Sequence, residues 1–131
     1  MKIEELENII NQAFEKKQNV SEKSDKQILD AINETVELTD KGKVRVAEKK
    51  NGLWSVNQWV KKAILLSFRI NKMTMSKGPY TTWYDKIQGK SVLWNEEDWK
   101  KAGYRHVPNG VVRKGSFIAK GVVLMPCFVN L

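Results

Sequence analysis

YRHVPNGVVRKGSFIAKGVVLMPCFVNL, residues 104–131, contains a repeat with a period of six. The repeat is clearest in one row of large apolar residues, namely Val111, Phe117, Val123 and Val129. A period of six fits neither the 3.6-residue turn of an α-helix nor the two-residue alternation of a strand. It is typical of a β-helix built from hexapeptide repeats, in which each segment directs one bulky apolar residue inward. We therefore expect this row to point into a β-helix.

Two further sets of residues follow the same period. A small residue lies four positions after each of the first three members of the row; these residues are Gly115, Gly121 and Cys127. A second apolar row consists of Val112, Ile118 and Leu124. A β-meander with a chance period explains the same pattern, and periodicity alone leaves both folds open. Three hexads make about one coil, whereas repeat folds need roughly three units, so we expect residues 104–131 to begin a longer structure.

The composition restricts the classes of protein that need to be considered. The chain has 131 residues, 41% of them hydrophobic, with five tryptophans, which suits one domain with its own core. Cys127 is the single cysteine, so an intrachain disulfide framework and a cysteine-based zinc site are excluded. The sequence contains neither an apolar run of membrane-spanning length nor a signal peptide, and we expect a cytoplasmic protein.

The net charge of +8 is divided unevenly along the chain. Residues 1–40 carry five lysines against ten acidic residues, whereas residues 41–131 carry 18 basic against five acidic residues. A basic body with an acidic helical end favours an anionic ligand, either nucleic acid or a small polyanion. A lysine-rich surface that only contacts solvent is an equally good explanation of the same charges.

Hydrophobic patterns predict three helices and a β-hairpin before residue 71. Residues 2–17 have the spacing of an amphipathic helix, and a second helix is predicted from a cap at Ser21 or Ser24 to Lys41-Gly42. We expect these two helices to form a helical hairpin that packs on the sheet of the domain. Asn51-Gly52 predicts a type I′ turn within a β-hairpin at 43–57. Asn57 is the predicted cap of a buried helix at about 58–70, in which the Ser67 hydroxyl bonds a carbonyl one turn earlier.

Residues 71–103 have weaker patterns. Gly78-Pro79 and Gly89 interrupt any long element, and segments 83–86 and 92–94 are predicted as short strands or packed loops. Asn95 is the predicted cap of a helix at 96–102, which ends at Gly103.

Candidate catalytic residues are few. Gly-rich phosphate loops, HExxH and GxSxG are absent from the sequence. His106 is the single histidine and is predicted to be a satisfied or solvent-exposed side chain rather than a catalytic one. Cys127 is predicted to be a core residue. Arg105 stands beside Tyr104 where a short helix gives way to a strand, and a guanidinium there could bind a carboxylate in bidentate fashion. On the residues alone, a surface ion pair with one of the glutamates is favoured.

Two long stretches resemble the tetrahydrodipicolinate N-succinyltransferase family. They are RVAEKKNGLWSVNQWVKKAILLSFRIN, residues 45–71, and AGYRHVPNGVVRKGSFIAKGVVLMPCFVN, residues 102–130. The resemblance covers essentially the whole chain. It implies an α+β fold, with an N-terminal domain at 1–103 that holds the helical hairpin, the β-hairpin and the buried helix. Residues 104–131 would then be the first, truncated coil of a left-handed parallel β-helix through which such proteins form homotrimers.

The resemblance also implies an activity in diaminopimelate and lysine biosynthesis. Such enzymes transfer succinyl from the co-substrate succinyl-CoA to a small dicarboxylate substrate, without a metal, a bound cofactor or a covalent enzyme intermediate. In this sequence it assigns substrate-carboxylate binding to Arg105. The family's acidic active-site residue and its CoA-binding coils correspond to positions beyond Leu131, so we expect this chain alone to be inactive. His106 and Cys127 depart from the residues usual in the family, and a basic nucleic-acid-binding module remains the alternative function.

Overall fold

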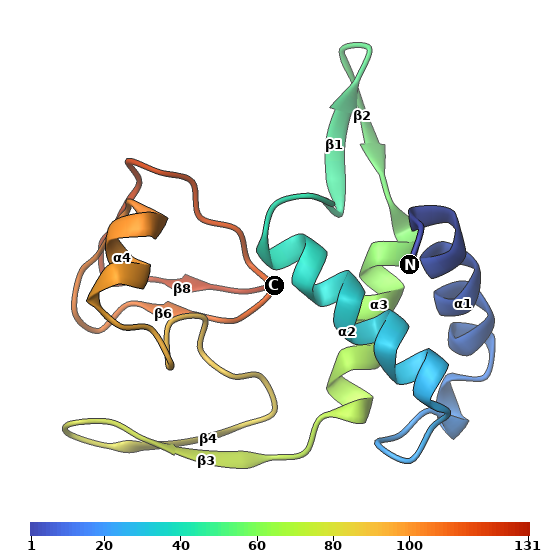
Figure 1. The fold of residues 1–131 in the computed structure, drawn as a ribbon, viewed down its shortest axis with the longest axis horizontal. Helices are drawn as coiled ribbons and strands as arrows, with labels where there is room; N and C mark the ends of the chain where they lie inside the picture. Colours follow the sequence, from blue (N-terminus) through green and yellow to red (C-terminus); the bar gives the residue numbers. More distant parts are fainter.

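The computed structural model describes all of residues 1–131 and has an α+β fold, as the sequence predicts. The fold consists of four α-helices and four separate two-stranded sheets (Figure 1). In chain order the helices and strands are α1 (Ile3–Glu15), a 3-10 turn (Lys17–Asn19), α2 (Lys26–Asp40), β1 (Ala47–Lys50), β2 (Leu53–Val56), α3 (Gln58–Ile70), β3 (Thr74–Lys77), β4 (Thr82–Asp85), α4 (Glu96–Ala102), β5 (Arg105–His106), β6 (Val111–Val112), β7 (Val123–Leu124) and β8 (Phe128–Val129). No helix among them has the length and apolar character needed to span a membrane.

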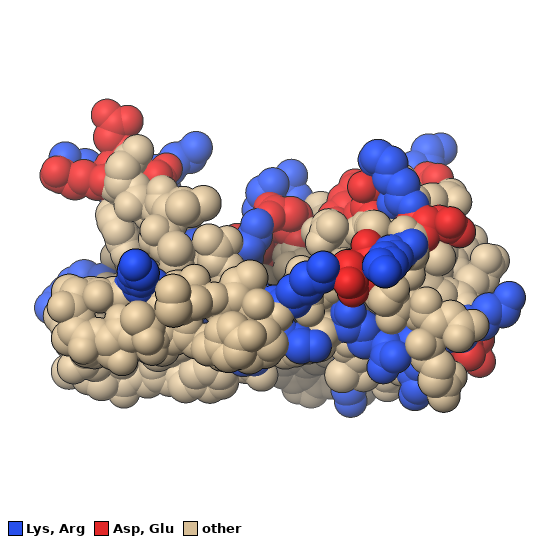
Figure 2. Space-filling model, turned by 90° about the horizontal axis from the view of Figure 1, so that it is seen from below, with Lys and Arg blue, Asp and Glu red and all other residues tan.

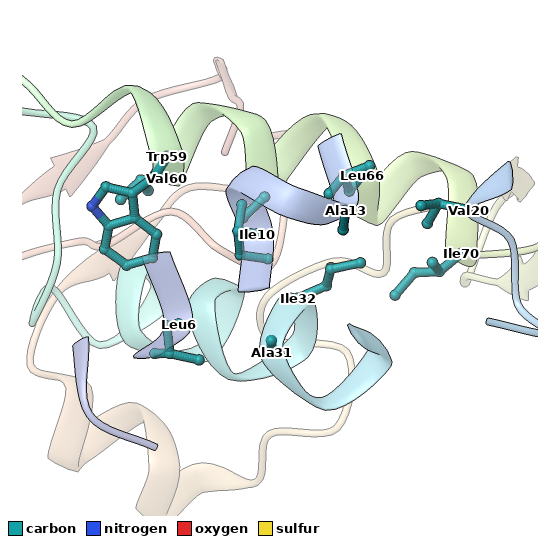
Figure 3. Close-up of a cluster of buried hydrophobic side chains, with 11 residues drawn as sticks. Leu6, Ile10, Ala13, Val20, Ala31, Ile32, Trp59, Val60, Leu66 and Ile70 are labelled. Carbon is teal, nitrogen blue, oxygen red and sulfur yellow. The ribbon is translucent and has the colours of Figure 1, made fainter. Parts of the chain in front are cut away.

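The core lies among α1, α2 and α3, which we call the helical unit. Each of these helices packs on the other two, and their apolar side chains meet between them (Figure 3). The buried cluster consists of Leu6, Ile10, Ala13, Val20, Ala31, Ile32, Trp59, Val60, Ala63, Leu66 and Ile70. The expectation that the first two helices pack on a sheet is therefore wrong. The apolar stripe of each helix is instead covered by the other two helices.

The predicted buried helix is confirmed as α3. Its Ser67 is buried, and the Ser67 hydroxyl donates to the carbonyl of Ile64 at 2.7 Å, as predicted. Asn57 does occupy the position before the first turn, but its side chain makes no cap. The Asn57 amide nitrogen donates to the Arg45 carbonyl and the Glu48 carboxylate instead, so it joins the start of α3 to the hairpin.

The two other predicted caps have opposite outcomes. α2 begins after Asp25, and Ser24 Oγ accepts a bond from the backbone N–H of Ser21 instead of capping the helix, so the predicted serine cap is wrong. At α4 the prediction is confirmed, because Asn95 Oδ1 accepts bonds from the N–H groups of Glu97 and Asp98. The Asn95 N–H in turn donates to Asp98 Oδ2, which completes a capping box.

Two antiparallel hairpins extend from the helices. In β1–β2, Asn51 and Gly52 have φ angles of 51° and 81°, the left-handed values that a type I′ turn requires. The predicted turn is thus confirmed, although the strands begin only at Ala47. The second hairpin, β3–β4, contains most of the predicted 83–86 segment, whereas residues 92–94 form a turn.

Residues 104–131, which we call the repeat segment, form two parallel strand pairs. Arg105 pairs with Val123, a separation of 18 residues, and Val111 pairs with Phe128, a separation of 17. The chain therefore makes one circuit and returns beside itself in parallel, with a slip of one residue before β8. This slip places Val129 beside Val112, and not beside Val111 as a strict period of six would require.

The four residues of the first apolar row differ in exposure, and Val129 is the one that is partly buried. Val111, Phe117 and Val123 are each nearly half exposed, whereas Val112 of the second row is buried. Ile118 and Leu124 are also less exposed than their neighbours in the first row. The Phe117 ring packs on Gly42, two residues after the end of α2. The inward direction of the first row stays a prediction.

Candidate functional site

Arg105 is the first residue of β5, and its side chain is exposed. Its backbone N–H donates to the Val122 carbonyl at 2.9 Å, whereas its guanidinium makes neither a hydrogen bond nor an ion pair. Two of the other three arginines are occupied: Arg69 donates to two carbonyls, and Arg113 donates to a carboxylate and an amide. The surface ion pair that the sequence left open for Arg105 is therefore not formed, and the guanidinium is available to a carboxylate ligand.

The backbone around Arg105 is held in place by α4 and a left-handed turn. Gly103 has a φ of 69°, and its N–H donates to the Trp99 carbonyl, so the chain leaves α4 sharply and enters β5. The next side chain, Tyr104, is buried against Trp94 and Trp99, with ring centroids 6.0 and 5.5 Å away. Because side chains alternate along a strand, burial of Tyr104 turns Arg105 outward.

Trp94, Trp99, Tyr104 and His106 form an aromatic cluster. Tyr104 and His106 each place one polar atom in it. The Tyr104 hydroxyl and His106 Nε2 are both buried without a hydrogen-bond partner. Burial, and secondarily the negative charge of Asp40, raises the pKa of Tyr104 above its usual value, so the phenol stays protonated. The His106 ring also packs on Trp99, 5.8 Å between centroids, and on Gly110. His106 is thus partly buried with an unpartnered Nε2, and its assignment as a non-catalytic residue stays a prediction.

A buried ion pair lies where α2 meets the repeat segment. Lys90 Nζ is 2.7 Å from Asp40 Oδ1 and also donates to the Asp40 carbonyl at 3.1 Å. The same carboxylate oxygen accepts a 2.7 Å bond from the N–H of Gly115. Three segments that are distant in sequence thus converge on Asp40, and this contact fixes the repeat segment against the helical unit.

A second polar link joins the repeat segment to the end of β4. The Arg113 guanidinium donates to Asp85 Oδ2 at 2.7 Å and lies between the rings of Phe68 and Phe128, 5.5 Å from each. Burial raises the pKa of the Asp85 carboxyl, but bonds from the Lys86 N–H and from Arg113 lower it by more, so it lies below its usual range. Arg113 is thus a structural residue, and the sequence analysis did not predict this role.

Two cavities adjoin the junction of the helical unit and the repeat segment. The smaller, of about 270 Å³, is mainly polar and includes Lys86, Lys114 and Glu37. The larger, of about 560 Å³, is an apolar groove that includes Val44, Ile64 and Phe117. Arg105 lines neither of them. The arginine that the sequence predicts to bind substrate is thus exposed outside these two cavities.

Cys127 is exposed and has no disulfide partner, so its predicted position in the core is wrong. No group of three or more histidine, cysteine, aspartate or glutamate side chains is arranged to hold a metal ion. Lys90 and Asp40 were not found by sequence reasoning, because lysines and aspartates are common and these two are 50 residues apart.

A profile of the family described as "Tetrahydrodipicolinate N-succinyltransferase N-terminal" matches residues 5–70, from the first turn of α1 to the end of α3. The chain belongs to this family. Membership confirms the resemblance seen in the sequence. The matched residues form the helical unit and the first hairpin.

Curated relatives match nearly the whole chain. A 2,3,4,5-tetrahydropyridine-2,6-dicarboxylate N-succinyltransferase of Pelagibacter ubique is 59% identical over 132 residues, which cover 98% of this chain and 48% of the relative. Proteins of the same name from Agrobacterium fabrum and from a Psychrobacter species are each 50% identical over 128 residues. They cover 95% and 96% of this chain, and 45% and 47% of the relatives. The chain thus spans about half the length of these N-succinyltransferases.

Proposed function

We propose that residues 1–131 form the N-terminal part of an enzyme that transfers a succinyl group from succinyl-CoA to tetrahydrodipicolinate. The observation that carries the proposal is family membership together with 59% identity to a named N-succinyltransferase across almost all of the chain. These relatives favour the enzyme over the basic nucleic-acid-binding module. The cytoplasmic location expected from the sequence stays a prediction.

The proposed reaction needs an amine placed beside a thioester. Water first hydrolyses the ring C=N bond of tetrahydrodipicolinate, which gives a ketone and a free amino group. This amino group attacks the thioester carbonyl; an N–C bond forms, the C–S bond breaks, and CoA leaves as its thiol. A base must take the proton of the amine, and the substrate must be held with its carboxylates neutralised. Arg105 is the proposed carboxylate-binding residue, supported by its exposed guanidinium without an ion pair and by the rigid turn that precedes it.

The repeat segment is proposed to be the first coil of a left-handed parallel β-helix that assembles as a homotrimer. The parallel pairing of strands 18 and 17 residues apart supports one three-hexad circuit. The left-handed turn at Gly103, between α4 and β5, supports a boundary between a domain at 1–103 and the coil at 104–131. The chain covers only about half of the relative's length, and only one circuit of the coil lies within it. We therefore propose that the 131-residue chain alone has no transferase activity.

A chimera tests this proposal directly. Residues 1–131 are joined to the C-terminal part of the Pelagibacter ubique relative that lies beyond the aligned stretch. CoA release is followed with a thiol reagent in the presence of succinyl-CoA and tetrahydrodipicolinate. We expect CoA release from the chimera and no release above background from the 131-residue chain. Release by the short chain, or none by a folded chimera, would contradict the proposal.

Arg105→Ala in the chimera tests the role of the guanidinium. A charge-assisted hydrogen bond contributes about 1.5–3 kcal/mol, so KM for the dicarboxylate should rise by roughly 10- to 100-fold, while KM for succinyl-CoA changes little. Arg45→Ala is the matched control, because its guanidinium also lacks a side-chain hydrogen bond yet belongs to the groove beside the first hairpin. Equal effects of the two substitutions would remove the assignment to Arg105.

A further inference from the structure

The chain contains two Asn-Gly pairs, Asn51-Gly52 and Asn109-Gly110. In such a pair the backbone nitrogen of the glycine can attack the asparagine side chain, because glycine has no side chain of its own to block the approach. Both asparagines are exposed, and both have a left-handed backbone, with φ angles of 51° and 72°. Exposure and backbone conformation therefore do not distinguish the two pairs, whereas their hydrogen bonds do.

The first pair, Asn51-Gly52, is unrestrained. It forms the tip of the β1–β2 hairpin, which projects away from the helices (Figure 1). Neither the Asn51 side chain nor the Gly52 N–H makes a hydrogen bond, and the space beside the Gly52 Cα is open. Neither strand packs extensively on any element except its partner, and an isolated two-stranded hairpin is only marginally stable in water. The turn is therefore free to open, and attack by the Gly52 nitrogen requires this opening.

The second pair, Asn109-Gly110, is restrained at both reacting groups. Asn109 Oδ1 accepts a 2.8 Å hydrogen bond from the hydroxyl of Tyr80, which lies in the turn between β3 and β4. The Gly110 N–H donates to the Val107 carbonyl at 3.1 Å, and the His106 ring lies against Gly110. Attack on Asn109 must therefore break two hydrogen bonds and displace a ring, none of which applies at Asn51.

The charges around the two pairs favour the same site. Lys49 and Lys50 directly precede Asn51, and Lys49 forms no ion pair. The attacking nitrogen must lose its proton, and nearby ammonium groups stabilise the negative charge that this creates. The broad face on the side of β3–β4, whose turn holds Asn109, carries few charged side chains (Figure 2). Electrostatics and hydrogen bonding thus both select Asn51.

We propose that Asn51 is a site of spontaneous deamidation in the folded chain, and that the structure protects Asn109. The Gly52 nitrogen attacks the side-chain carbonyl carbon of Asn51; a C–N bond forms, the bond to the amide nitrogen breaks, and ammonia leaves with the proton of the Gly52 N–H. Water then opens the cyclic imide at either of its carbonyls, which gives aspartate or isoaspartate. The reaction needs only water and does not depend on the proposed activity.

The two products should affect the hairpin differently. Aspartate keeps the original backbone and is common in type I′ turns, so this product adds a negative charge beside Lys50 and leaves the turn in place. Isoaspartate carries the backbone through the former side chain and lengthens it by a carbon. A two-residue turn does not accommodate the longer backbone with the observed pairing of Lys50 and Leu53. Isoaspartate should therefore loosen the hairpin irreversibly.

Incubation of the 131-residue chain at neutral pH, followed by peptide mass spectrometry, tests the site. Chromatography separates the aspartate and isoaspartate peptides from the parent peptide. We expect both products at Asn51, formed at least about tenfold faster than at Asn109, because two hydrogen bonds must break at Asn109. In concentrated urea both pairs lie in an unfolded chain, and the two rates should approach each other. Equal rates in the folded chain, faster reaction at Asn109, or a difference that persists in urea overturns the proposal.

Tyr80→Phe tests the protection of Asn109. The substitution removes the hydroxyl that holds Asn109 and keeps the ring, so deamidation at Asn109 should become faster while the rate at Asn51 stays unchanged. Tyr84→Phe is the matched control, because Tyr84 is equally exposed on the same hairpin and should change neither rate. Far-UV circular dichroism confirms that both variants are folded. If Tyr80→Phe leaves the rate at Asn109 unchanged, or Tyr84→Phe raises it as much, hydrogen bonding does not protect Asn109 and the proposal fails.

Discussion

Lys90→Met is expected to loosen the contact between the helical unit and the repeat segment. The side chains of Lys90 and Asp40 are only 7% and 17% exposed, and their charged groups lie 2.7 Å apart. Methionine has a similar length but no charge, so the substitution removes the ion pair and leaves the volume nearly unchanged. The Asp40 carboxylate would then remain in a largely buried site with the Gly115 N–H as its remaining partner.

The magnitude follows from the environment of Asp40. Removing one partner of a buried ion pair costs about 3–5 kcal/mol in general. Asp40 keeps one backbone hydrogen bond and some contact with solvent, so the expected loss of unfolding free energy is smaller, about 2–3 kcal/mol. Asp40 is also the last residue of α2, where a negative charge is unfavourable by about 0.3–1 kcal/mol, and Lys90 at present compensates that charge.

Urea unfolding measures this loss, with far-UV circular dichroism for the helices and tryptophan fluorescence for the aromatic cluster. Lys100→Met is the matched control, because Lys100 pairs with Glu96 on an exposed face, where an ion pair contributes about 0–1 kcal/mol. We also expect faster hydrogen exchange at the Gly115 amide in Lys90→Met. If both substitutions cost the same small amount, and the Gly115 amide stays protected, Asp40 and Lys90 do not hold the two parts together.

Three further predictions concern other parts of the chain. Asn95→Ala removes the capping box of α4 and should lower the unfolding free energy by about 1 kcal/mol in urea; an unchanged midpoint would contradict the cap. Gly52→Ala places a side chain at a φ of 81°, so it should destabilise the hairpin by about 1–2 kcal/mol, seen as faster hydrogen exchange at 47–56, while exchange in α3 stays unchanged. The pKa of Asp85 is lowered in the folded state, so its contribution to stability is complete above about pH 4 and is lost as the pH falls through the folded value. The stability difference between the wild type and Asp85→Asn should therefore shrink below about pH 4, and a difference independent of pH would show that the carboxylate charge is not involved.

Local signals in the sequence predicted several features of the fold correctly. Asn51-Gly52, the Asn95 cap and the Ser67 back-bond each depend on residues within a few positions of one another, so short-range sterics and hydrogen bonding determine them. Arg105 was likewise identified from its place between a short helix and a strand, which the structure has at α4 and β5. Its role in carboxylate binding stays a prediction.

Long-range contacts decided the features that the sequence left open or placed wrongly. The period of six predicted neither the one-residue slip in the pairing of β6 with β8 nor the packing of Phe117 on Gly42. The Asp40–Lys90 and Asp85–Arg113 pairs join residues 50 and 28 positions apart. A charged residue has many partners of opposite sign along a chain, and the sequence does not state which of them folding brings within hydrogen-bonding distance.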